Sequence, residues 1–428
     1  MIKADWFPAG FLFSYKCTYL YCEKSIPISS NMKIQHYFVV AMLCVATVAS
    51  AQDMFRVNVQ EPQHAKMTVS PAVPEDGMVP AGTVFNVKIS DIEPGWAFDS
   101  GYYLMMGGAV RWPVYQESMV PEFSFKVTGN VMGLGASIME ASRTEGYKVI
   151  QDIVYAQPGV KPLKYDAFIP DGAKNLPGVV IIHGGGWSSN TEDIMRGLAR
   201  ELVKGGKYVV FSVDYRFIGK GDGDETENTM TDLVNDCYGA VLHIQKHAKE
   251  YGLDRRKIAV TGDSAGGHLS SLIADAVERV GKKGFVPTYM PKGMWMCRAR
   301  KWLKGIKAAA PSYGVFDAQS LSRFAQGLSE EETKAIVPMD NVPEVRKRAI
   351  PQFLTLGTLD RTVGREPMEQ YVQLLKDKGQ RVEYHLIEGA SHAFFDWKPD
   401  QRTKDTFAQF GVPYAKKMQE FFDSVFYK

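Results

Sequence analysis

A serine between two glycines is the first candidate for chemistry in this 428-residue chain. Residues 262–266 read Gly-Asp-Ser-Ala-Gly, after the mostly apolar run 257–261 and before apolar residues at helical spacing within 269–273. This pattern predicts a strand, a sharp turn and a helix, and the glycines leave room for the turn. The turn would expose the hydroxyl of Ser264 at the positive end of the helix, where it could act as a nucleophile.

A glycine-rich loop upstream could stabilise the negative charge that attack by a serine creates on a carbonyl oxygen. Residues 183–187 read His-Gly-Gly-Gly-Trp and directly follow the apolar run 179–182. Glycines let backbone N–H groups approach a substrate oxygen closely. We therefore predict that the N–H groups of Gly184, Gly185 and Ala265 form an oxyanion hole. A phosphate-binding loop would end in Lys-Ser or Lys-Thr, and this loop does not.

Strand and helix patterns alternate from about residue 146 to residue 428. An opening hairpin at 149–155 and 163–169 is followed by short apolar runs of the kind buried in parallel sheets, at 179–182, 208–214, 257–261, 306–310, 353–357 and 382–388. Helical spacing marks the stretches 192–204, 229–251, 367–378 and 406–426, the last interrupted or restarted by Pro413. This order predicts an α/β domain over 146–428 with a doubly wound, mostly parallel sheet.

Residues 52–145 have a different pattern. Phe85, Val87 and Ile89 alternate with polar residues, as do the apolar residues of 123–127, so strands with one buried face are expected. We predict a small all-β module, similar to a β-sandwich or a β-grasp. Its aromatic side chains are expected mainly in its core, with glycan contact as the alternative, at Trp96, Tyr102, Tyr103 and Trp112.

Three motifs of the α/β part resemble a known family. The loop 183–187, the strand end Asp214-Tyr215-Arg216 and the turn Gly-Asp-Ser-Ala-Gly-Gly at 262–267 are similar to the esterase branch of the α/β-hydrolases. That branch includes hormone-sensitive-lipase-like esterases and carbohydrate esterases of the acetyl-xylan and feruloyl type. The resemblance covers about 146–428 and implies a serine esterase with the oxyanion donors named above.

The acid and then the base follow the serine along the chain in this fold. Asp360 lies just after the strand 353–357, and His392 lies in a loop after the strand 382–388 that also matches the family. We predict that His392 is the general base and that Asp360 orients its imidazole and stabilises its positive charge. The other histidines lie in the N-terminal segments, the glycine loop, helices or a strand: His36, His64, His183, His243, His247, His268 and His385.

Two other aspartates compete for the role of the acid. Asp396 follows His392 too closely, and Asp317 follows an earlier strand. Asp360 could also merely cap its loop. Relatives commonly have a proline soon after this acid, whereas Arg361-Thr362-Val363 follows here, which weakens the alignment of this loop.

The segment from Met32 to Ala51 is typical of a secretory signal peptide. A short basic start precedes the apolar stretch 37–48, and an Ala-Ser-Ala sequence ends the segment. The stretch is shorter than the roughly 20 residues that span a bilayer, so stable membrane insertion is not expected. We expect a secreted or periplasmic protein, with residues 1–31 as a leader or an artefact of the assigned start. Cleavage would leave Cys237 and Cys297, whose pairing stays open.

The charge balance excludes some partners. With 50 basic and 48 acidic residues the formal charge is only +2, which provides no basic stripe for nucleic acid. No His/Cys cluster indicates zinc, and we predict neither a metal nor a cofactor. Asp222, Asp224 and Glu227 carry oxygen ligands suited to calcium, but their incomplete spacing favours a solvated acidic turn.

Substrate specificity is expected from segments above the sheet. The aromatic-rich segments 285–304 and 313–351, with Trp187, Trp295 and Trp397, would form a wall for an acyl group or a sugar, unless they are ordinary packing. Together with export and a β module, this favours removal of acetyl or feruloyl groups from plant polysaccharide. The alternatives are a short-chain lipid esterase or lipase, a prolyl-type serine peptidase, and an inactive hydrolase-like protein that binds glycans.

Overall fold

The computed structural model describes residues 53–108, 110–281, 284–398 and 400–427. The predicted leader at 1–31 and signal peptide at 32–51 lie outside these ranges. None of the helices within the ranges combines the length and the apolar character that crossing a membrane requires.

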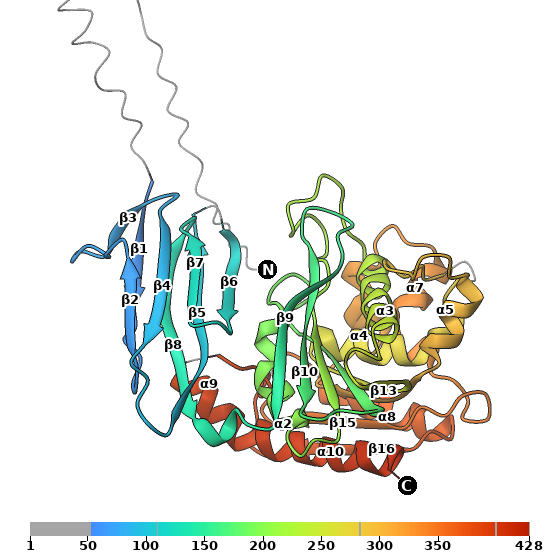
Figure 1. Cartoon of the computed structure of the whole chain (residues 1–428). Helices are drawn as coiled ribbons and strands as arrows, with labels where there is room; N and C mark the ends of the chain where they lie inside the picture. The colour runs from blue at the N-terminus through green and yellow to red at the C-terminus, as the bar shows by residue number, and fades with distance from the viewer. Residues whose placement is uncertain (1–52, 109, 282–283, 399, 428) are drawn as a thin grey trace, which may run out of the picture. The chain divides into compact units, whose positions relative to one another are not determined.

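Eight strands before residue 146 form two sheets (Figure 1). The five-stranded sheet has the order β3-β1-β8-β5-β6, and the three-stranded sheet has the order β2-β4-β7. Phe85, Val87 and Ile89 are buried in one core together with Val57 of the other sheet, as expected when two sheets pack face to face. The strands are β1 (Met54–Val59), β2 (Lys66–Ser70), β3 (Met78–Pro80), β4 (Val84–Ser90), β5 (Trp96–Gly107), β6 (Val110–Ser118), β7 (Glu122–Lys126) and β8 (Asn130–Glu140).

An eight-stranded sheet follows, in the order β16-β15-β14-β13-β11-β12-β10-β9. Strands β11 to β16 pair in parallel, with β11 between β12 and β13. Strands β9 and β10 form an antiparallel hairpin at one edge. The predicted mostly parallel sheet and its opening hairpin are confirmed. The strands are β9 (Tyr147–Ala156), β10 (Leu163–Pro170), β11 (Leu176–Ile182), β12 (Val209–Val213), β13 (Leu253–Asp263), β14 (Ile306–Ser312), β15 (Gln352–Gly357) and β16 (Val382–Ile387).

Helices alternate with these strands along the chain (Figure 1). They are α2 (Arg196–Val203), α3 (Met230–Lys246), α4 (Ala265–Asp275), α5 (Met296–Leu303), α6 (Ala318–Leu321), α7 (Glu330–Ile336), α8 (Arg365–Asp377), α9 (Gln401–Thr406) and α10 (Val412–Phe426). Pro413 occupies the first turn of α10, after a π-helical turn, so the final helix restarts there as predicted.

Successive residues of the central strands face opposite sides of the sheet. In β11, Val180 and Ile182 share a core with α3 and α4, whereas Val179 and Ile181 share a second core with α2, α8 and α10. Burial on both sides explains why the strands read as almost continuous apolar runs. Because β11, β13, β15 and β16 are parallel, their carboxyl ends lie at one edge of the sheet.

The β-rich part packs against the α/β part through β5 and β6. Tyr102 and Tyr115 belong to the same core as α2. Two arginines of α2 also form ion pairs with buried carboxylates of these strands, Arg196 with Glu117 and Arg200 with Asp99. Asp53–Lys428 consequently form one compact unit. No local sequence pattern predicted this packing, because the residues of β5, β6 and α2 are remote from each other along the chain.

Candidate active site

Ser264 lies in a sharp turn between β13 and α4. Its backbone has a φ of 50° and a ψ of −115°, a conformation that side chains rarely adopt. A Cβ atom on Gly262 or on Gly266 would overlap the carbonyl oxygen of Ile182, so only glycine fits at both positions. The strand, turn and helix predicted around the serine are therefore present, and Ser264 itself is the strained residue.

The side chains of Ser264, His392 and Asp360 form one hydrogen-bond chain. The Ser264 hydroxyl lies 3.0 Å from Nε2 of His392, and Nδ1 of His392 lies 2.8 Å from Oδ2 of Asp360. With Nδ1–H donating to Asp360, Nε2 is left to accept the hydroxyl proton. The structure thus brings together the three residues predicted from the order of strands.

Asp360 is held as a carboxylate. Burial alone would favour the neutral acid, but hydrogen bonds from His392 and from the backbone N–H groups of Val363 and Thr362 lower the pKa of Asp360 below its usual value. The N–H of Thr362 donates at 2.8 Å, and a proline at that position would lack this donor. The departure from the family pattern after Asp360 is therefore compatible with its role.

The glycine loop lies beside the serine, but its first N–H group is already used. Gly184 N–H donates to Oδ1 of Asp263 at 2.6 Å, so the prediction that Gly184 binds the oxyanion is wrong. The N–H groups of Gly185 and Gly186 meet no acceptor among the described residues. Ala265 opens α4, where an N–H has no partner within the helix. The oxyanion roles of Gly185 and Ala265 stay predictions, and Gly186 is the available third donor.

The role of Asp263 was not predicted from the sequence, although this residue immediately precedes Ser264. Burial raises the pKa of Asp263 well above its usual range, and the neighbouring carboxyl of Asp396 adds to the effect. A neutral Asp263 can hydrogen-bond to Asp396 and still accept the N–H of Gly184. Asp396, the rival for the role of the acid, therefore faces Asp263, while Asp360 takes the hydrogen bond from His392.

The buried side chain of His183 connects the glycine loop to the residues that follow β12. Its Nδ1 lies 2.6 Å from the carbonyl oxygen of Gly184, its Nε2 lies 3.1 Å from Oδ1 of Asp214, and its ring stacks on Tyr215 with centroids 4.3 Å apart. Burial alone would raise the pKa of Asp214, but Lys161 and His183 keep it below its usual value, so the charged form is favoured. The Asp-Tyr-Arg motif at this strand end thus supports the loop and does not reach the serine.

A cavity of about 310 Å³ opens beside Ser264. Of the three predicted substrate-binding tryptophans only Trp187 lines it, and its indole N–H donates to Nδ1 of His268 at 3.2 Å. Trp295 is 79% exposed and Trp397 lines a separate small cavity beside α2, so both predictions are wrong. Gly186 of the glycine loop also lines the cavity, and the remaining lining comes from the segments after β14 and β15, at Gly314, Val315, Phe316, Asp317, Ser320, Arg323, Thr362, Val363, Gly364 and Pro367.

The two aromatic-rich segments, 285–304 and 313–351, lie in different places in the fold. Residues from 313–351 line the Ser264 cavity as expected, whereas none from 285–304 does. The latter segment forms α5 and contributes Phe285 and Leu303 to a core. Cys297 on α5 and Cys237 on α3 are both free thiols.

The acidic turn after β12 is less solvated than predicted. The Asp222 side chain is only 1% exposed and accepts the N–H of Phe217 at 2.6 Å. Burial raises the pKa of Asp222 to about 6. Asp224 accepts the N–H of Val160 at 2.7 Å, so both carboxylates have backbone partners that hold the turn.

Known proteins are similar to the α/β part. A sequence profile of the family described as BD-FAE matches residues 165–292. Carboxylesterase NlhH of Mycobacterium tuberculosis is 36% identical over 142 residues, 32% of this chain and 39% of that protein, so the match spans about two fifths of this relative. Esterase LipI of the same organism is 26% identical over 230 residues, 53% of this chain and 67% of that protein.

A solved structure has the same fold. Esterase 2 of Thermogutta terrifontis, in the structure phosphonylated by sarin, superposes with a TM-score of 0.51 and 24% identity, covering 66% of this chain and 95% of that one. The chain therefore has the α/β-hydrolase fold of these esterases, preceded by a β-rich module.

Proposed function

We propose that this protein is a serine carboxylic ester hydrolase whose reaction passes through an acyl-enzyme on Ser264. The observation that carries the proposal is the hydrogen-bond chain from Ser264 through His392 to Asp360, with links of 3.0 and 2.8 Å. The similarity to proteins named carboxylesterase and esterase supports it. A base that is hydrogen-bonded to a serine and oriented by a third group is the arrangement that activates a serine as a nucleophile.

Each residue of this hydrogen-bond chain has a role in the reaction. Oγ of Ser264 attacks the ester carbonyl while its proton passes to Nε2 of His392, which then donates that proton to the departing alcohol. Asp360, held as a carboxylate, stabilises the imidazolium between these two transfers. His392 then takes a proton from a water molecule that attacks the acyl carbon, and it returns this proton to Oγ of Ser264 as the bond to the acid breaks.

The negative oxygen formed at each attack needs donors. We assign this role to the N–H groups of Gly185, Gly186 and Ala265, because Gly184 donates to Asp263. Removal of one such donor typically costs about 100-fold to 1,000-fold in kcat. The hydrogen bond from Gly184 to Asp263 keeps the loop beside the serine.

The substrate we favour is an acetyl or feruloyl ester of plant polysaccharide, met outside the cytoplasm after export by the signal segment 32–51. A cavity of about 310 Å³ lined by Trp187, Val315 and Phe316 suits an acetyl or a planar aromatic acyl group. Sequencing the N-terminus of the exported protein tests cleavage after Ala51.

A panel of substrates separates the proposal from its alternatives. We expect hydrolysis of p-nitrophenyl acetate, methyl ferulate and acetylated xylan, and loss of activity in Ser264→Ala with unchanged thermal unfolding. Activity confined to long-chain acyl glycerols would favour a lipase, and cleavage of prolyl peptide amides in preference to esters would favour a peptidase. Binding of glycans without any ester hydrolysis would contradict the proposal.

A further inference from the structure

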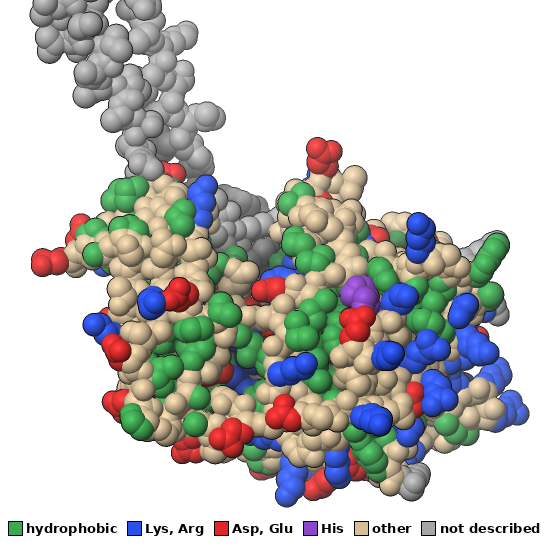
Figure 2. Space-filling model, viewed as in Figure 1, with side chains coloured by type: hydrophobic (Ala, Val, Ile, Leu, Met, Phe, Trp, Pro, Cys, Tyr) green, Lys and Arg blue, Asp and Glu red, His purple; other side chains and the backbone are tan. Residues whose placement is uncertain are grey.

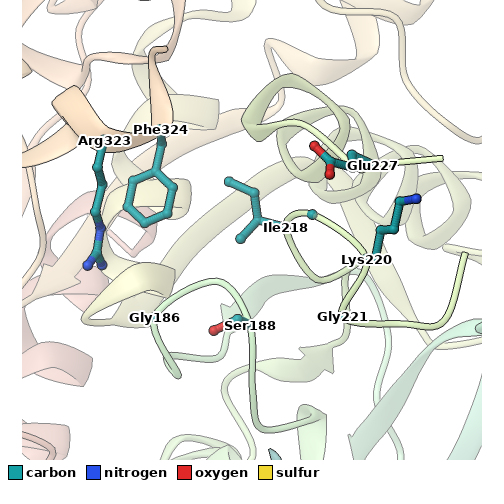
Figure 3. A pocket seen from close by; sticks show the side chains of 9 residues that line it. Gly186, Ser188, Ile218, Lys220, Gly221, Glu227, Arg323 and Phe324 are labelled. Carbon is teal, nitrogen blue, oxygen red and sulfur yellow. The ribbon is translucent and has the colours of Figure 1, made fainter. Parts of the chain in front are cut away.

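A second cavity adjoins the one that contains Ser264. It has a volume of about 530 Å³, and Gly186 and Arg323 line both cavities (Figure 3). Gly186 belongs to the glycine loop, and Arg323 belongs to the short helical turn Ser322–Phe324 that follows α6. A substrate bound at Ser264 can therefore extend past these two residues into the second cavity.

The walls of the second cavity are attached to the glycine loop. The N–H of Ile218 donates to the carbonyl oxygen of Trp187 at 2.8 Å, and the ring of Phe324 packs edge-on against Trp187 with centroids 4.8 Å apart. Ile218 and Phe324 thus hold fixed positions relative to the loop that flanks Ser264. Figure 3 shows Arg323 and Phe324 on one side of the cavity and Lys220 and Glu227 on the other.

The lining combines apolar and hydrogen-bonding groups. Phe324 and Ile218 present an aromatic ring and an aliphatic side chain, whereas Lys220, Glu227 and Arg323 present exposed charged groups. The guanidinium of Arg323 lies over the Phe324 ring, 4.4 Å from its centroid. Within the described ranges none of these three charges takes part in an ion pair. A pyranose ring has the matching chemistry, since its C–H faces stack on apolar side chains and its hydroxyl groups pair with charged donors and acceptors.

We propose that the second cavity binds a sugar ring of the ester substrate, with Phe324 and Ile218 as the apolar surface and Lys220, Glu227 and Arg323 as the hydroxyl partners. The inference rests on the proposed ester hydrolysis at Ser264, which it deepens by placing the alcohol-bearing saccharide. Arg323 stands between the sugar and the reacting ester, so it acts as a positioning residue. An aliphatic chain would make no hydrogen bond to these three charged groups, whereas a sugar ring would.

Kinetic selectivity tests the assignment. The ratio of kcat/KM for monoacetylated xylotetraose to kcat/KM for p-nitrophenyl acetate is expected to fall about tenfold in Lys220→Ala and in Glu227→Gln, as for loss of a hydrogen bond to a charged group. The matched controls Lys249→Ala and Glu331→Gln remove the same charges at exposed positions that line neither cavity, and the ratio should not change. An unchanged ratio in both cavity variants would overturn the proposal.

A binding measurement separates this proposal from the proposed function. In the Ser264→Ala protein, which cannot form an acyl-enzyme, calorimetry with unesterified xylotetraose should show binding that Lys220→Ala and Glu227→Gln each weaken about tenfold. If the wild-type protein cleaves p-nitrophenyl acetate but Ser264→Ala binds no xylotetraose, the sugar site is refuted and the esterase stands. If no ester is cleaved but xylotetraose binds and the variants weaken that binding, the esterase is refuted and the sugar site stands.

Discussion

The N–H of Gly184 donates to Oδ1 of Asp263 at 2.6 Å, so the residue before Ser264 holds the glycine loop beside the Ser264 turn. This contact couples two motifs that are remote in sequence, the glycine loop after β11 and the turn after β13. It gives the aspartate of Gly-Asp-Ser-Ala-Gly a positioning role, distinct from the role of Asp360.

Substitutions of Asp263 test this coupling. Asp263→Asn keeps an oxygen that accepts the Gly184 N–H and an amide that donates to Asp396, so we expect activity near that of the wild type. Asp263→Ala removes the acceptor, and displacement of the loop donors should lower kcat about 100-fold. Steady-state kinetics on p-nitrophenyl acetate measure both effects. Equal activity of the two variants would show that the contact does not position the loop.

The raised pKa of Asp263 predicts a pH dependence of stability. In the unfolded chain this carboxyl ionises near the ordinary value for Asp, whereas burial and Asp396 keep it neutral to higher pH in the folded protein. The unfolded state therefore binds fewer protons between the two pKa values, and the free energy of unfolding falls as pH rises through that window. Asp263→Asn has no such ionisation. Urea titrations of both proteins across mildly acid to neutral pH should give a flatter curve for the variant, and parallel curves would contradict this.

Tryptophan substitutions distinguish the aromatic residue at the cavity from the one at the surface. Trp187→Ala removes a buried side chain that lines the Ser264 cavity and packs against Phe324, so we expect a loss of about 3–5 kcal/mol of stability and a lower kcat/KM. Trp295→Ala removes a side chain that is 79% exposed, and its effect on stability should stay within about 0.5 kcal/mol. Loss of activity in Trp295→Ala alone would reinstate Trp295 as a substrate-binding residue.

The buried ion pairs between the β-rich part and α2 predict that the two parts unfold together. Arg196 is 1% exposed and lies 2.7 Å from Oδ1 of Asp193 in addition to its contact with Glu117. Arg196→Ala would leave these carboxylates buried without a cation, which costs about 3–5 kcal/mol. Calorimetry should show one transition that moves to lower temperature. Two separate transitions in the wild-type protein would indicate independent domains.

The sequence predicted those features that depend on local patterns. Period-two alternation identified strands such as β4, and short apolar runs identified the central strands, because burial on one face or on two faces leaves different signatures. Ser264, Asp360 and His392 were found because parallel strands deliver their carboxyl-terminal loops to one edge of the sheet. Chain order alone then assigns acid and base.

Features that depend on contacts between remote segments could not be predicted. The aromatic content of 285–304 suggested a substrate wall, but α5 packs elsewhere and leaves Trp295 in solvent. Gly184 looked equivalent to Gly185 because the sequence does not show that Asp263 accepts its N–H. The ion pair between Arg196 and Glu117 likewise has no local signature.

The most direct test of the site is covalent labelling of Ser264. We expect a fluorophosphonate probe to add one group to the purified protein and mass spectrometry to locate it on Ser264, because the hydroxyl lies 3.0 Å from the base His392. His392→Ala should greatly slow the labelling. A folded protein that stays unlabelled, or carries the probe on another residue, would contradict the assignment of Ser264 as the nucleophile.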